Sequence, residues 1–221
     1  GRALKEAVTP LRVEERASAL AYWAAYYQTL PGGPRLRGSL DLNRAIRSVP
    51  RIGRGQQNER ERGAVPRDFV RMLAQYPEFE AAVDRFGTTE PVDVSLSRLA
   101  EAGAYLYLAN ASTHPLVFIH ALTGPAAVRL LVSAMPSALH ATTLAHCWQA
   151  VAAWVAAYGG DGPDTSNDAA PPSEAQIVER AVGTRDHHAI KFAEACLREY
   201  RLNPKAVFLK AALDWPLRLL A

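Results

Sequence analysis

Apolar residues recur at helical spacing along almost the whole chain. Leu20, Trp23, Ala24 and Tyr27, for example, stand at positions i, i+3, i+4 and i+7 of one segment, which places them on one side of a helix. No segment alternates apolar and polar residues with the convincing period of two that a half-buried strand requires. The sequence therefore predicts an all-α fold, an irregular multi-helix bundle.

Capping residues, prolines and glycines indicate where the helices begin and end. Thr9 before Pro10 opens the first helix, Ser173 with Gln176 forms a capping box, and Asp186 caps a late helix. Further predicted caps are Thr113, Ser137, and Asp93 or Ser95. The predicted helices cover residues 9–30, 40–49, 66–76, 78–86, 93–110, 138–158, 173–182 and 186–200, together with a helix that starts at Thr113 and a last helix from residue 203 that Pro216 interrupts.

The length and composition of the chain fit one domain. Its 221 residues are 49% hydrophobic and carry a formal charge of only +3, which is enough apolar content for one sizeable core. We therefore expect a single helical domain over residues 1–221, with flexible loops at 51–65 and 161–172, where Gly, Pro and polar residues are frequent. The basic segment 35–67 has no interleaved aromatic residues on which bases could stack, so we expect no nucleic-acid site.

Cysteine usage and hydropathy indicate the compartment. Cys147 and Cys196 lie in separate helical patterns, which fits neither a disulfide framework nor a zinc ribbon. No apolar run is predicted to reach the roughly 18 residues that a membrane span needs, and the start of the chain has no secretory signal. We therefore expect a cytoplasmic protein without membrane contact.

The helix predicted from residue 186 onward carries the candidate chemistry. His188, Lys191 and Phe192 share one of its faces, whereas Glu194 and Arg198 form an i,i+4 pair on a neighbouring face. Only four of the 25 basic residues are lysines, so a lysine beside apolar residues is an unusual choice. Two interpretations remain open: a surface helix in which the lysine pairs with Glu194, or half of a buried polar site.

The other histidines are harder to interpret. His120 stands just before Gly124-Pro125, where a proline cannot donate to the carbonyl of residue 121, so we expect a kink beside this histidine. It is either a packing residue or part of a site. His114 lies about 120° away around the same helix, and His140 and His146 are interpreted as satisfied core or surface histidines.

Three segments together resemble the questin oxidase-like family. They are residues 21–28 running into Leu30-Pro31-Gly32, residues 118–127, and residues 186–200 followed by Asn203-Pro204. Related proteins look longer at the N-terminus and carry further histidine-bearing segments there. The resemblance therefore implies the C-terminal portion of a longer helical protein, with a second chain or segment supplying the remainder.

The resemblance also implies an activity, the oxygen-dependent opening of a ring in an aromatic polyketide of the anthraquinone type. The reaction would be Baeyer–Villiger-like or that of a dioxygenase, with non-haem iron and, in some members, NADPH; no motif for a tightly held flavin is present. His120, His188 and Lys191 match the family pattern, which implies that they are catalytic residues and metal ligands. Since an ammonium group cannot ligate a metal, Lys191 would have to be buried and carboxylated. His187 stands where the family more often has an acidic residue.

Aromatic residues are the candidate substrate contacts. Tyr22, Trp23, Tyr26 and Tyr27 form a stripe at helical spacing, which usually belongs to a core but can also line an aromatic pocket. We expect Trp23, Tyr27 and Phe192 to hold the flat substrate that the resemblance implies.

Two other functions stay open. One is a non-catalytic helical module that packs against or binds a partner, and the other is a hydrolytic metal site, which would need acidic ligands near the two histidines. The sequence contains no Gly-x-Gly-x-x-Gly, P-loop, His-Glu-x-x-His or Gly-x-Ser-x-Gly motif.

Overall fold

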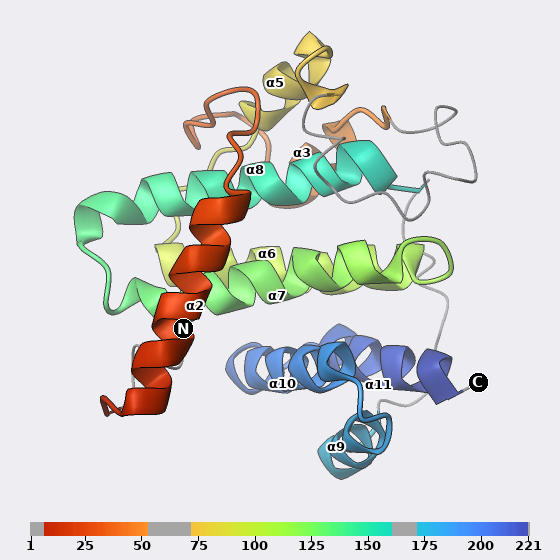
Figure 1. Cartoon of the computed structure of the whole chain (residues 1–221). Helices are drawn as coiled ribbons and strands as arrows, with labels where there is room; N and C mark the ends of the chain where they lie inside the picture. The colour runs from red at the N-terminus through yellow and green to blue at the C-terminus, as the bar shows by residue number, and fades with distance from the viewer. Residues whose placement is uncertain (1–6, 53–71, 161–171, 221) are drawn as a thin grey trace.

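The structure is a computed structural model that describes residues 7–52, 72–160 and 172–220, and within them it confirms the all-α fold (Figure 1). The helices are α2 (Pro10–Tyr26), α3 (Leu42–Ser48), α5 (Pro77–Val83), α6 (Val92–Asn110), α7 (Pro115–Val132), the short 3-10 helix η2 (Ser137–Leu139), α8 (His140–Tyr158), α9 (Glu174–Gly183), α10 (His187–Leu202) and α11 (Ala206–Leu220). Extended pairing in the described residues is limited to two isolated bridges, Arg37 with Gly87 and Leu40 with Phe86.

Helices α6 and α7 form the centre of the bundle. On one side they pack against α8, which in turn contacts α5, and on the other side they pack against α10 and α11, with α9 outside these two (Figure 1). The core between the layers contains the fully buried rings of Trp148, Phe118, Phe192 and Phe208. The indole of Trp148 also donates a 2.9 Å hydrogen bond to the carbonyl of Val83, which fixes α8 against α5.

A glycine allows α6 and α7 to approach each other closely. A Cβ atom on Gly103 would lie 2.4 Å from the carbonyl oxygen of Ala121 and 2.5 Å from its carbonyl carbon. Such distances are far inside van der Waals contact, so only glycine fits where the two backbones cross. Residue 121 is the chain neighbour of His120, so the close approach of the two helices occurs beside this histidine.

Charged side chains hold α10 against α7. Arg129 of α7 donates from Nε and Nη2 to the carboxylate of Glu199, at 3.0 to 3.2 Å. Arg198 pairs with Glu194 at 3.1 Å, as its i,i+4 spacing predicts, and also donates to the carbonyl of Ala126. These contacts fix the two helices that carry the candidate residues.

Several predicted helix starts are confirmed. Thr9 accepts the backbone N–H of Arg12 at 3.3 Å, and Asp186 accepts that of Ala189 at 2.8 Å. Ser173 forms the complete capping box with Gln176. In each case the signal is local, since the cap and its partner lie within one turn.

Other predicted caps are wrong. The Thr113 hydroxyl donates to the carbonyl of Asn110 instead of capping α7, whose first residue follows His114. Ser137 lies in the 3-10 helix before α8. Helix α6 begins directly after Pro91, so Asp93 lies inside its first turn, and Ser95 lies inside the same helix.

Two helices end differently from the prediction. Helix α2 stops at Tyr26, short of residue 30, and α11 continues through Pro216 to Leu220. The proline inside α7, Pro125, likewise leaves that helix unbroken. Both prolines are buried inside the bundle. Most of the helix predicted at 66–76 and of the loops predicted at 51–65 and 161–172 lies outside the described residues.

Helix α7 is more apolar than the sequence analysis recognised. Its 18 residues, with a mean hydropathy of 1.6, are long and apolar enough to cross a bilayer by length and composition, so the expectation that no segment reaches this limit is wrong. The helix packs against α6, α8 and α10, and a core helix surrounded in this way acquires the same composition.

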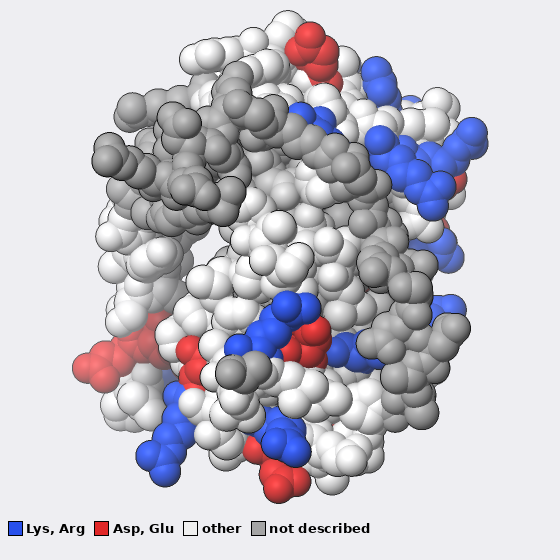
Figure 2. Space-filling model, turned by 90° about the vertical axis from the view of Figure 1, so that its right-hand side faces the viewer, with Lys and Arg blue, Asp and Glu red and all other residues white. Residues whose placement is uncertain are grey.

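Charges of both signs share the surface at the C-terminal end of α11. Figure 2 shows basic and acidic side chains interspersed in the lower half of this face, basic side chains gathered at its upper right, and an uncharged middle. In the lower half, therefore, neither sign predominates.

Candidate functional site

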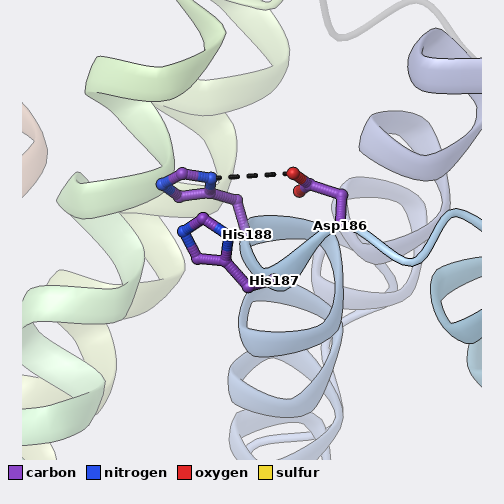
Figure 3. A group of neighbouring side chains, drawn as sticks. All are labelled: Asp186, His187 and His188. Atoms are coloured by element: carbon purple, nitrogen blue, oxygen red, sulfur yellow. Dashed lines mark ion pairs between the residues drawn. The ribbon is translucent and has the colours of Figure 1, made fainter.

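The first residues of α10 bring a carboxylate and two imidazoles together. Asp186 Oδ1 accepts the backbone N–H of Ala189, whereas Asp186 Oδ2 lies 3.9 Å from His188 Nδ1. The rings of His187 and His188 lie next to each other, with centroids 3.9 Å apart, and both point toward the neighbouring helices (Figure 3). One ligand atom from each of the three residues lies within 4.8 Å of the other two.

The Asp186 carboxyl is held in its ionised form. Its pKa lies below the usual value, mainly because the carboxylate accepts the Ala189 N–H; partial burial acts in the opposite direction, and the neighbouring His188 lowers the pKa further. Only Oδ1 is engaged by the cap. The second oxygen lies 3.9 Å from His188 Nδ1, and the indole of Trp215 also lowers the pKa of this carboxyl.

His120, on α7, is influenced by the charge of His188. Its pKa is lowered, first by burial of the ring among protein atoms and then by the positive charges of His188 and Lys191. The residue is exposed to solvent, so the protein covers its ring only in part, and this partial cover disfavours the imidazolium. The charges of His188 and Lys191 thus both act on His120, and the lowered pKa favours the neutral imidazole, the form that can bind a metal.

Lys191 does not fit the role that the resemblance implies. Its side chain is exposed, whereas Phe192 and Ala195 on the same helix are buried. Carboxylation of a lysine depends on burial that favours the neutral amine, so the expectation of a buried Lys191 is wrong. The residue stands at the edge of the site as a positive charge.

Two of the three residues expected to contact the substrate lie away from the candidate site. Phe192 is fully buried and packs against the ring of Tyr107 at 4.7 Å between centroids, so it belongs to the core. Tyr27 is 61% exposed and follows the end of α2, a helix without any buried residue. The expectation that the aromatic stripe packs into a core is therefore wrong as well.

Trp23 does line a cavity, of about 500 Å³, between α2, α7 and α8. Most of its wall is apolar, and the lining residues are Trp23, Gly124, Pro125, Val128, Thr142, Thr143, His146, Cys147, Ala150 and Trp154. The ring of Trp154 lies 6.3 Å from that of His120, so the cavity is next to this histidine. Burial raises the pKa of the Cys147 thiol to about 12, which keeps it protonated and unreactive at neutral pH.

A second, more polar cavity of about 760 Å³ lies near the turn between α10 and α11. Two of its cations already have partners, since Arg98 pairs with Glu90 at 2.8 Å and Arg129 pairs with Glu199. It contains none of the histidines, so we place the candidate site at α7 and the start of α10.

The sequence analysis missed two of the residues that the structure brings together. Asp186 was interpreted as a cap, and His187 was left without a role. Asp186-His187-His188 resembles phosphoesterase motifs superficially, but the companion aspartates and strands of those motifs are absent, so the run was interpreted as a coincidence. The signal that could have found them is a carboxylate followed directly by two histidines at a helix start, because the second oxygen of a capping carboxylate remains available.

The donor set fits a divalent transition metal. Two imidazoles and one carboxylate are the ligands typical of non-haem iron(II) sites with open positions, and His120 lies outside this group of three. Because the Asp186, His187 and His188 donors span up to 4.8 Å, small side-chain rotations would be needed to close around one ion. No family model matches the chain, and neither a curated protein nor a solved structure does.

Proposed function

We propose that this chain carries the metal site of an oxygen-dependent oxidoreductase that opens a ring of an aromatic polyketide of the anthraquinone type. The observation that carries the proposal is the Asp186-His187-His188 group, whose donor atoms lie within 4.8 Å of one another. His120 supports it, because its pKa responds to the charge of His188 and its ring lies 6.3 Å from Trp154 of the aromatic-lined cavity. The resemblance to the questin oxidase-like family supplies the substrate class and the Baeyer–Villiger-like or dioxygenase chemistry.

In this proposal Asp186, His187 and His188 hold iron, and His120 completes the set from α7. Bound iron would supply the redox chemistry that molecular oxygen requires. The ammonium group of Lys191, at the exposed edge of the site, stabilises negative charge that develops on an oxygen atom of the substrate ring. The cavity beside Trp154 holds the substrate, and NADPH is the expected reductant where the reaction needs one.

The first experiment measures metal binding. The protein is purified without chelators, stripped, and titrated with iron(II) under nitrogen, and we expect one equivalent to bind. His188→Ala and His120→Ala should each weaken the affinity for iron by about tenfold or more. Loss of a residue that only hydrogen-bonds to a metal ligand already has an effect of this size, and loss of a ligand itself should cost at least as much. Asp186→Asn keeps a capping side chain and removes the anionic donor, so it separates metal binding from helix capping.

The control is His140→Gln, because His140 binds the carbonyls of Val132 and Met135, away from the candidate site. This variant should bind iron as the unsubstituted protein does. Absence of stoichiometric binding, or equal affinity in all variants, would contradict the proposal.

The exposed apolar residues of α2 favour a second candidate, a non-catalytic helical scaffold that binds a partner. Leu11, Leu20, Tyr22 and Tyr26 are all exposed on this helix. Oxygen uptake distinguishes the two candidates, with 1,8-dihydroxyanthraquinone as the probe and with NADPH present or absent. Iron-dependent uptake that His188→Ala abolishes supports the oxidoreductase, whereas iron binding without uptake favours the scaffold.

A further inference from the structure

The amide of Gln149, a buried residue of α8, has only one possible orientation. Its Nε2 faces three backbone carbonyls after α2, those of Pro31 at 2.9 Å, Gly32 at 3.1 Å and Leu30 at 3.5 Å. Carbonyl oxygens only accept hydrogen bonds, so the amide nitrogen must face them. The flipped amide would instead place four oxygen atoms together.

This orientation determines where the proton of His146 lies. Gln149 Oε1, which can only accept, lies 2.9 Å from His146 Nδ1. Nδ1 must therefore carry a hydrogen and donate it. In the neutral ring Nε2 then carries a lone pair, and His146 is exposed to solvent, so this lone pair is open to water or to a ligand.

His146 lines the cavity between Trp23 and Trp154. With Nδ1 engaged by Gln149, Nε2 is the polar atom that the ring can offer to a bound molecule. Two indole side chains in the wall favour a flat aromatic ligand, since aromatic rings stack on one another. An acceptor in a mostly apolar wall favours ligands that can donate a hydrogen bond to it.

We propose that His146 selects ligands of this cavity that carry a hydroxyl group on a flat aromatic ring, by accepting the O–H hydrogen bond at Nε2. Gln149 is a positioning residue, because it fixes the tautomer and the direction of the imidazole. An aromatic ligand whose hydroxyl is methylated keeps the stacking surface and loses the hydrogen bond. The inference rests on the proposed function for the place of the substrate, but it concerns binding alone.

The test compares 2-naphthol with 2-methoxynaphthalene on metal-free protein by isothermal titration. The unsubstituted protein should bind the naphthol about fivefold more tightly, the effect of one net hydrogen bond. His146→Phe preserves a ring and removes the acceptor, so the two ligands should then bind within about twofold of each other. Gln149→Ala should reduce the preference, because the imidazole loses its fixed direction.

Thr142→Val is the matched control, since Thr142 lines the same cavity and the variant should keep the fivefold preference. Circular dichroism checks that each variant is folded. Equal affinity of the two ligands for the unsubstituted protein, a preference that survives His146→Phe, or failure of both ligands to bind overturns the inference. Selective binding of the naphthol by a protein that fails to bind iron would overturn the proposed function and leave this inference standing.

Discussion

Glu199 shows what a single residue contributes to this bundle. Its side chain is fully buried and pairs with Arg129, whose side chain is 15% exposed. A buried ion pair gives little net stability over apolar residues of the same volume, but removal of one partner leaves an uncompensated charge. The pair therefore matters most for how α10 is placed against α7.

The Glu199→Ala variant should lose about 3 to 5 kcal/mol of unfolding free energy in urea denaturation, because Arg129 would stay largely buried without its partner. The exposed pair of Arg98 and Glu90 is the control, and Arg98→Ala should cost less than about 1 kcal/mol. Equal losses in the two variants would show that burial of the Glu199 pair is unimportant.

The lowered pKa of His120 predicts a pH effect. The pKa of His120 is 6.5 in the unfolded chain and lower in the folded protein. At a pH between these two pKa values, the unfolded chain binds a proton that the folded protein does not. Stability should therefore fall as the pH drops below 6.5 and should be unaffected by this group above that value.

His120→Gln removes the group, so the difference in unfolding free energy between pH 7.5 and about pH 5 should be smaller in the variant than in the unsubstituted protein. Asp186 does not interfere, because the ordinary pKa of its carboxyl is 3.8 and the folded value is lower. A difference that is the same in both proteins would mean that the ring is not desolvated.

At the scale of the elements, the bundle depends on how closely α6 and α7 pack. Gly103 gives those helices their short separation, and the close approach occurs beside His120 on α7. Alanine has the higher helix propensity by about 1 kcal/mol, so helix propensity and packing predict opposite effects of a Gly103→Ala substitution.

We expect the steric clash to outweigh the gain in helix propensity, because the new Cβ would lie 2.4 Å from the Ala121 carbonyl oxygen. Gly103→Ala should destabilise the protein by about 1 to 3 kcal/mol in a thermal or urea unfolding experiment. Gly183→Ala is the matched control, since a Cβ there has no atom within 4 Å. A stabilised Gly103→Ala variant would show that the helices are not in close contact.

The sequence predicts the elements better than it predicts their surroundings. The caps at Thr9, Ser173 and Asp186 were found because a cap and its partner lie within one turn. Spacing identifies which residues share a face, but it does not reveal which neighbour covers that face. For this reason the exposure of Lys191 and of α2 could not be predicted from the sequence.

At the scale of the whole molecule, the candidate site depends on two helices that are far apart in the sequence. His120 lies in α7, and the Asp186-His187-His188 group lies at the start of α10, on the other side of α8 and α9 in chain order. The resemblance placed His120 and His188 in one site, and the pKa of His120 is consistent with their proximity. Asp186 became a candidate ligand only in three dimensions.

Anomalous diffraction at the iron edge, from crystals loaded with iron(II), tests the central claim most directly. We predict one strong peak between α7 and the start of α10, within bonding distance of His188 and Asp186 and close to His120. Crystals of His188→Ala grown in the same way should lack it. A peak elsewhere in the molecule, or no peak in crystals of the unsubstituted protein, would contradict the account.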